Sequence, residues 1–238
     1  MMDGGNIPDN ELLIISFIGL HRSGKTASIE SLIGYLKTKG YRTGTVKLMQ
    51  HGDIPVDEVG KDTWRHRKAG AEFVIALTHN YTYLLSDCPD FQSMSGLLSI
   101  VPLSCQILIL EGKPDSPDEH IPVNEVVCLK DLADIDETLK VRDVKEPFAF
   151  AGIFSEGFKE KYEREDRVLL WDPTEKKILT DRFVEQPNRI KNKREGIKSN
   201  VREVPILNLL HQDDVIYLAH ILLATGKRYT RVIRNERK

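Results

Sequence analysis

The chain has 238 residues and a formal net charge of −2 at pH 7, with 40% hydrophobic and 29% charged residues. These proportions are typical of a soluble globular protein, and a charge so close to zero gives no overall attraction to nucleic acid or to a membrane. No apolar run approaches the roughly 20 residues needed to span a bilayer, and the polar, acidic segment 1–11 does not resemble a signal peptide. We therefore expect a cytoplasmic protein with one large α/β domain, or one domain with an added module.

The first strong pattern is a strand, a glycine loop and a helix in direct succession. Residues 11–18 form an almost unbroken apolar run, which is typical of a strand buried on both faces of a parallel sheet. Residues 19–26, Gly-Leu-His-Arg-Ser-Gly-Lys-Thr, fit the phosphate-loop (Walker A) pattern of Gly, four residues, Gly-Lys and Ser or Thr. Apolar residues at three- and four-residue spacing then predict a helix over 24–39.

This order predicts a site for the phosphates of a nucleotide. Gly19 and Gly24 let backbone N–H groups approach phosphate oxygens, and the start of the helix presents further N–H groups to the same anion. Lys25 is expected to reach the β- and γ-phosphates, and the hydroxyl of Thr26 to coordinate Mg²⁺. The alternative, a glycine turn with a solvated Lys25, is disfavoured by the strand and helix that flank the loop. The loop residues expected to bind nucleotide are Gly19, His21, Arg22, Ser23, Gly24, Lys25, Thr26 and Ala27.

The rest of the chain alternates strands and helices. Strands are expected over 42–48, 72–77, 81–85, 106–111, 126–129, 148–154 and 204–209, and helices over 62–69, 93–101, 131–140 and 213–224. The stretch 49–60 is expected to be a long loop on the nucleotide side of the sheet. Past residue 155 the pattern changes, because 156–166 is almost entirely charged or Gly, and 167–171 with 177–183 predicts a β-hairpin.

This alternation predicts an α/β protein with the three-layer P-loop NTPase fold and a mostly parallel sheet. The expected parts are a nucleotide-binding core over 1–155, an insertion with a hairpin and a basic helical segment over 156–203, the closing strand and helix of the core over 204–226, and a basic tail over 227–238. Basic runs are usually solvated, so we interpret 187–202 and the tail in this way; binding of a polyanion is the alternative.

The three cysteines are too few and too scattered for a disulfide framework. None belongs to a Cys-x-x-Cys pair, which argues against a zinc knuckle or a thioredoxin-type centre. Cys105 and Cys128 lie in or beside apolar runs and are expected to be buried, inert thiols; the third is Cys88.

A P-loop site needs an acidic group at the end of another strand to help position Mg²⁺. Glu111 ends the predicted strand 106–111, so we expect it to act there with Lys25 and Thr26; a solvated carboxylate is the alternative. Other polar residues follow the second strand and are candidates for a switch or substrate site: Lys47, His51, Lys61, Asp62 and Arg65. Asp62 and Arg65 lie three positions apart on a predicted helix, so a plain surface ion pair remains an alternative for them.

Four segments occur together in an order shared with a known family: Gly19–Thr26, Thr43–Lys47 with His51, Gly60–Ala71 and Leu110–Lys113. They resemble the molybdopterin-guanine dinucleotide biosynthesis adaptor family, MobB. The resemblance covers about 12–155 and 204–224, and it excludes 156–203 and the tail. It implies a protein that binds GTP and Mg²⁺, hydrolyses GTP weakly and is usually a homodimer. Such proteins work beside the guanylyltransferase that attaches GMP to molybdopterin.

The chain departs from the family pattern in several places. Leu48 follows Lys47 where the family commonly has His, and His21 and Arg22 stand where small residues are common. A clean Asn-Lys-x-Asp guanine motif is absent; Asn192–Glu195 imitates one, but it lies in the predicted insertion. By resemblance the base would lie near 153–156, where the Glu156 carboxylate would accept hydrogen bonds from guanine.

Three classes of function follow from these residues. The first is a GTP-dependent adaptor with weak GTPase activity in molybdenum or tungsten cofactor maturation. The second is a P-loop metallochaperone GTPase, which requires a compact Cys/His cluster that the sequence does not offer. The third is an ATP-dependent small-molecule kinase, which requires a pocket for the phosphate acceptor. A structural module without nucleotide is the remaining alternative.

Overall fold

The computed structural model describes residues 7–48, 60–86, 93–113, 118–131, 134–144, 146–152, 168–172, 174, 177–178 and 202–231. The chain forms two compact units. The first unit comprises Met1–Leu48, Pro102–Lys113 and Pro122–Lys238, and the second comprises Met49–Val101 and Pro114–Ile121. The nucleotide-binding core expected over 1–155 contains residues of both units, and its boundaries stay a prediction.

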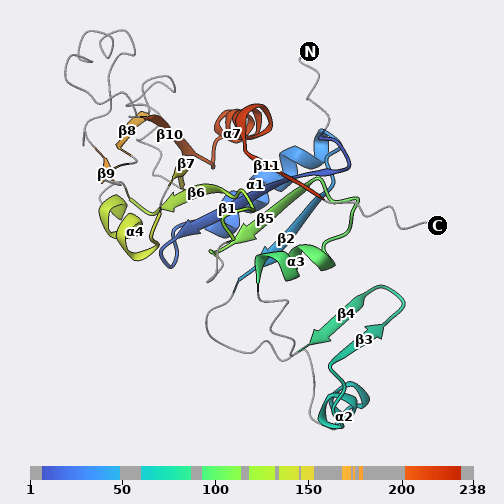
Figure 1. Ribbon diagram of the computed structural model, residues 1–238. Helices are drawn as coiled ribbons and strands as arrows, with labels where there is room; N and C mark the ends of the chain where they lie inside the picture. The colour runs from blue at the N-terminus through green and yellow to red at the C-terminus, as the bar shows by residue number, and fades with distance from the viewer. Residues whose placement is uncertain are drawn as a thin grey trace, which may run out of the picture. The chain divides into compact units, whose positions relative to one another are not determined.

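A single sheet organises the first unit (Figure 1). Its strands are, in spatial order, β2 (Thr43–Lys47), β5 (Ile107–Glu111), β1 (Glu11–Gly19), β6 (Asn124–Leu129), β7 (Pro147–Gly152), β10 (Arg202–Asn208), β8 (Val168–Asp172) and β9 (Lys177–Ile178). Every pair from β2 to β10 is parallel, whereas β8 and β9 are antiparallel additions. The carboxyl ends of the six parallel strands therefore lie at one edge of the sheet.

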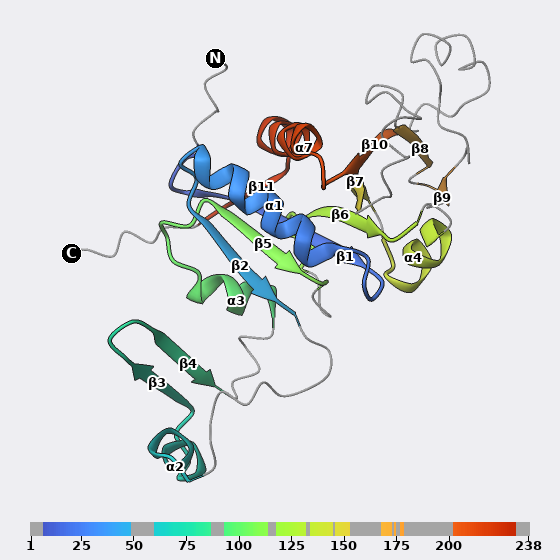
Figure 2. The ribbon, with the colours of Figure 1, turned by 180° about the vertical axis from the view of Figure 1, so that it is seen from behind.

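Helices cover both faces of the sheet, which gives three layers. Leu13, Ile15 and Phe17 of β1 are fully buried in one core with α1 (Lys25–Thr38) and α7 (Gln212–Thr225). Ile18 belongs to the other core, which includes α4 (Ile135–Val141). Figure 2 shows α1 lying in front of the strands. The almost unbroken apolar sequence of β1 is thus explained by burial on two sides, and the predicted α/β fold is confirmed.

The predicted hairpin after residue 155 adds strands to the same sheet. β8 pairs antiparallel with β10 and with β9, so it lies between them. Trp171 of β8 is fully buried in the core that includes α4. The rest of the expected hairpin, 179–183, and the expected basic helical segment lie outside the described residues.

The first residues of the expected basic tail form a strand, β11 (Arg228–Thr230). It pairs antiparallel with Glu11–Leu13 of β1, while β6 pairs with Ile15–Gly19 on the same strand. The buried Asn124 joins the two neighbours, because its Nδ2 donates to the carbonyls of Ile14 and Lys227, each at 2.9 Å. Its Oδ1 accepts from the backbone N–H of Lys227 at 2.9 Å. This segment is therefore part of the sheet, not a solvated tail.

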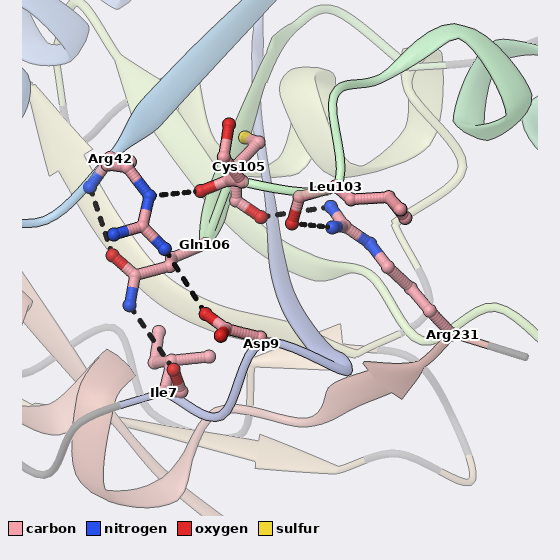
Figure 3. A network of polar contacts seen from close by, with 8 residues as sticks. Ile7, Asp9, Arg42, Leu103, Cys105, Gln106 and Arg231 are labelled. Atoms are coloured by element: carbon pink, nitrogen blue, oxygen red, sulfur yellow. Dashed lines mark hydrogen bonds and ion pairs between the residues drawn. The ribbon is translucent and has the colours of Figure 1, made fainter. Parts of the chain in front are cut away.

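A polar network connects the segments at the amino ends of the central strands β1, β2 and β5 (Figure 3). Arg42, just before β2, donates through its backbone N–H to Gln106 Oε1 at 3.1 Å and through Nη2 to Asp9 Oδ1 at 3.3 Å. Gln106 Nε2 donates to the Ile7 carbonyl at 3.2 Å. Arg231, just after β11, donates to the carbonyls of Leu103 and Cys105. The segments that lead into β1, β2 and β5 are thus tied to one another and to the end of β11.

The second unit contains α2 (Asp62–Lys68), β3 (Phe73–Leu77), β4 (Thr82–Ser86) and α3 (Met94–Ile100). β3 and β4 lie close to the strands expected over 72–77 and 81–85, and they pair antiparallel. Alternate residues of a strand share a face, and Ile75 pairs with Leu84. One face of the hairpin therefore carries four exposed apolar side chains, which we call the hairpin face: Phe73, Ile75, Leu77 and Leu84.

Candidate functional site

The glycine loop leaves β1 at the edge where the parallel strands end. A Cβ added at Gly19 would lie 2.3 Å from the Cys128 carbonyl oxygen and 2.5 Å from Ser23 Oγ, so only glycine fits there. Gly24 has φ 81° and Arg22 has φ 59°, two left-handed conformations within three residues. Strain of this kind at Arg22 costs on the order of 1 kcal/mol, and such strain is typical of functional loops.

Helix α1 begins at Lys25, directly after the left-handed Gly24. Its first turn contains no acidic side chain, and no side chain caps it. The unpaired N–H groups and the positive end of the helix dipole are therefore left for an anion. Ser23 is almost fully buried, whereas His21 and Arg22 are exposed.

The Lys25 ammonium lies over the loop. Its Nζ donates to the carbonyls of Leu20 at 2.6 Å and Gly19 at 3.2 Å, and it lies 3.4 Å from Ser23 Oγ. Burial lowers the pKa of Lys25, and the positive charges of Arg142 and Lys47 lower it further, while the negative charge of Glu111 raises it.

Thr26 of α1 and Glu111 of β5 meet beside the loop. Thr26 Oγ1 donates to Glu111 Oε1 at 2.9 Å, and Lys47 Nζ lies 3.5 Å from the same oxygen. Lys47 and Glu111 are paired in the register of β2 and β5, and Thr26 reaches Glu111 from the first turn of α1. A hydroxyl and a carboxylate at this separation are suitable oxygen ligands for Mg²⁺.

Sequence reasoning missed two cations beside the loop. Arg142, directly after α4, donates from Nε to the Gly19 carbonyl at 3.1 Å. Lys113, which follows Glu111 by two residues, donates to the carbonyls of Asp143 at 2.6 Å and Arg142 at 3.4 Å. Arg142 carries no sequence signal, since only the packing of α4 on the sheet brings it to the loop. Lys113 was noticed only as part of the segment that ends β5.

The cysteines occupy the buried positions expected of them. Cys105 and Cys128 are both buried and free. Burial raises the pKa of Cys128, which lies beneath the loop, to about 12. The thiol therefore stays protonated at neutral pH and has no thiolate character. Cys88 lies outside the described residues.

The other expected site residues either lie outside the described residues or belong to the second unit. His51 and Glu156 lie outside the described residues. Lys61, Asp62 and Arg65 belong to the second unit and are described there by themselves. Arg65 Nη1 lies 3.8 Å from Asp62 Oδ1, with both side chains well exposed. This geometry matches the surface ion pair considered as an alternative, and a role in a switch stays a prediction.

The geometry of the loop fits the phosphates of a nucleotide with Mg²⁺. A glycine-tight turn, a free helix start and Lys25 converge on one space, and Thr26 with Glu111 offers two oxygen ligands beside it. Mg²⁺ bound with nucleotides typically takes one or two protein oxygens, with phosphate oxygens and water completing its coordination. Among the described residues there is no group of three or more His, Cys, Asp or Glu that could hold a metal ion.

A parallel sheet with this loop between its central strand and a covering helix is the arrangement of the P-loop NTPase fold. A model of the family "MobB: Molybdopterin guanine dinucleotide synthesis protein B" matches residues 14–144, more than half of the chain. The chain belongs to this family.

Relatives and a solved structure agree with this assignment. The molybdopterin-guanine dinucleotide biosynthesis adapter protein of Haemophilus influenzae is 29% identical over 130 residues, covering 54% of this chain and 72% of the relative. The adapter protein of Escherichia coli is 33% identical over 123 residues, covering 50% and 67%. The crystal structure of Bacillus subtilis MobB has the same fold, with a TM-score of 0.51 and 18% identity over 90% of this chain and 98% of that chain.

No helix in the described part of the chain is long and apolar enough to cross a membrane.

Proposed function

We propose that the chain binds GTP with Mg²⁺ at residues 19–26 and serves as a GTP-dependent adaptor in the guanylylation of the molybdenum cofactor. The observation that carries the proposal is the convergence of Lys25, Thr26 and Glu111 on one space beside the loop. In this proposal the loop residues and Lys25 hold the β- and γ-phosphates, and Thr26 with Glu111 holds Mg²⁺. Family membership supports the adaptor role, and the partner is the guanylyltransferase that consumes GTP in that step.

Hydrolysis of GTP is expected to be slow. Catalysis in this class consists mainly of positioning and charge neutralisation, which Lys25, Mg²⁺ and the backbone N–H groups would supply. In the described part of the chain, the only carboxylate that contacts the loop side chains is Glu111, and it accepts a hydrogen bond from Thr26 and pairs with Lys47. A residue committed to these contacts is poorly suited to activate water, so GTP acts mainly as a bound ligand.

The test is a calorimetric titration of GTP and of ATP, each with Mg²⁺, into the wild type and the Lys25→Ala variant. We expect GTP to bind the wild type and to lose at least about a hundredfold in affinity with Lys25→Ala, because a charge-assisted contact to phosphate is removed from a partly buried site. Lys37→Ala is the matched control, since Lys37 is an exposed lysine in the last turn of the same helix.

Each outcome of the titration has a clear meaning. GTP binding that is unchanged in Lys25→Ala would remove the loop from the proposal. A preference for ATP would replace the adaptor by the small-molecule kinase considered from the sequence. Absence of binding to the wild type would refute the nucleotide function of the isolated chain.

We further infer that two copies of the chain associate through the hairpin face. Its side chains are 40–77% exposed, and a lone two-stranded sheet is at best marginally stable in water. A second copy of the chain presents the same apolar face. Two copies related by a two-fold axis would therefore bury both faces against each other. The homodimer expected from the family resemblance is therefore consistent with the exposed residues of β3 and β4.

A further inference from the structure

Arg142 reaches the phosphate loop from a different element. The residue directly follows α4, on the sheet face opposite to α1, yet its Nε donates to the Gly19 carbonyl at 3.1 Å. The same oxygen accepts from Lys25 Nζ at 3.2 Å. Because both donors contact one oxygen, the guanidinium and the ammonium are close neighbours at the start of the loop.

The backbone of Arg142 is held in place. Lys113 Nζ donates to the carbonyls of Arg142 and Asp143 and lies 3.2 Å from Glu125 Oε1. The Lys113 and Glu125 side chains are only 22% and 15% exposed, so this anchor is shielded from water. The chain then turns at Asp143 with φ 44°, and Val144 N donates to the Leu139 carbonyl at 3.2 Å. Arg142 is thus fixed both at its backbone and at Nε, and little rotamer freedom remains to be lost on binding a ligand.

The Nη1 and Nη2 atoms of the Arg142 guanidinium are available to donate hydrogen bonds to a ligand. An arginine side chain carries five N–H donors, and only the one on Nε is used here. Among the described residues, Nη1 and Nη2 of Arg142 have no hydrogen bond or ion pair. A planar pair of donors beside Lys25 matches the oxygens of a phosphate group, which arginine binds bidentately.

We propose that Arg142 is a phosphate-contacting residue that binds the terminal phosphates of a nucleoside triphosphate in the loop, beside Lys25. The inference rests on the proposed function and deepens it, because it assigns a preference for the triphosphate over nucleotides with fewer phosphates. Arg142 and Lys25 at the Gly19 carbonyl and Lys47 beside Glu111 supply three positive charges, against the one carboxylate that contacts the loop among the described residues. This excess of positive charge favours a ligand that still carries negative charge after Mg²⁺ has bound.

The experiment compares affinities for GTP and GDP with Mg²⁺, and for GMP, in the wild type and in Arg142→Ala and Arg142→Gln. We expect both variants to lose about tenfold to a hundredfold in GTP affinity, with a smaller loss for GDP and less than about twofold for GMP. Arg142→Lys keeps the charge without the planar donors and should restore part of the loss. Lys140→Ala removes an exposed charge from the last turn of α4, which Arg142 follows, and should leave all three affinities unchanged.

Melting temperatures of the ligand-free variants show whether Arg142 contacts the phosphates or only holds the loop in place. Equal losses for GTP, GDP and GMP, together with a lower melting temperature, would mean that Arg142 only holds Gly19, and the inference would be wrong. Unchanged GTP affinity in Arg142→Gln would also overturn it, and this variant retains a side-chain donor should Arg142→Ala fold poorly. If the wild type binds GTP and Lys25→Ala does not, the proposed function stands whatever Arg142 shows. If the wild type fails to bind GTP, both proposals fail together.

Discussion

At the scale of single residues, the conformation of the loop requires that Gly19 has no Cβ atom. Gly19→Ala would place Cβ against the Cys128 carbonyl and Ser23 Oγ, and a carbonyl of a central strand cannot easily move. We expect a loss of about 1–3 kcal/mol in the free energy of unfolding, as for other overpacked sites, and a larger relative loss of GTP affinity because the loop itself must shift. Thermal unfolding and GTP titration measure the two effects.

Gly34→Ala is the matched control for Gly19→Ala. Gly34 lies inside α1, and a Cβ there would meet no atom within 4 Å. Since alanine favours a helix over glycine by about 1 kcal/mol, this variant should be more stable than the wild type. If Gly19→Ala were as stable as Gly34→Ala, the close approach to Cys128 would not matter.

The metal role of Thr26 is a second prediction at this scale. Thr26→Val keeps the shape of the side chain but removes the hydroxyl that contacts Glu111. We expect the gain in GTP affinity that Mg²⁺ provides to fall by about tenfold or more, while affinity in the presence of a chelator is unchanged. Thr26→Ser should behave as the wild type. An equal Mg²⁺ effect in Val and Ser variants would exclude the hydroxyl as a ligand.

From the sequence, the site residues that could be placed are those whose positions are fixed by a short segment of the chain. Lys25 and Thr26 could be predicted because the loop pattern fixes their positions relative to one helix start. Glu111 could be predicted because it ends a buried strand, and parallel strands end at one edge. Arg142 could not be predicted, because its approach to Gly19 depends on how α4 packs on the sheet and on the anchor at Lys113.

At the scale of elements, Asn124 of β6 makes two hydrogen bonds to Lys227, the residue directly before β11, and a third to Ile14 of β1. Asn124→Ala leaves the Ile14 and Lys227 carbonyls and the Lys227 N–H without this partner. Unsatisfied buried groups cost about 1–3 kcal/mol each, so we expect a loss of at least about 2 kcal/mol in the free energy of unfolding, measured by urea denaturation.

A contrasting variant tests whether the charge of Lys227 matters instead. Lys227 Nζ lies 2.6 Å from Glu146 Oε2, but these side chains are 62% and 43% exposed. Exposed pairs of this kind contribute at most about 1 kcal/mol, so Lys227→Ala should cost less than Asn124→Ala. The opposite order would show that β11 is held by charge.

The strands and helices of the core were predicted close to their observed bounds, and β11 was not. Glu11–Gly19 and Lys25–Thr38 carry long apolar patterns, which are set by burial. Arg228–Thr230 is only three residues long and polar, and its sequence gives no periodicity to detect. Its pairing depends on the free edge that β1 presents before β6 begins.

At the scale of the whole molecule, the hairpin face predicts self-association. Ile75→Asp places a charge at the centre of that face, beside Leu84. We expect the variant to sediment as a monomer at concentrations where the wild type is a dimer, because a charge buried in an apolar interface without a partner is costly. Analytical ultracentrifugation measures this, with unchanged circular dichroism as evidence of folding.

The control for Ile75→Asp lies on the opposite face of the same hairpin. Ala76→Asp adds the same charge on the neighbouring residue, which points away from the hairpin face. It should leave the association unchanged. A wild type that is monomeric at all concentrations would refute the dimer. The division into two units had no counterpart in the sequence pattern, because it depends on which distant segments contact one another.

The pairing of β11 with β1 also bears on the order in which the protein can fold during synthesis. Arg228 contacts Glu11 across 217 positions of the chain, a separation that gives this part of the sheet a very high contact order. Domains generally fold as units, so this sheet is completed only once its last strand has been made. The strand that carries the phosphate loop is made first, but it gains its last neighbour only after residue 230 has been translated.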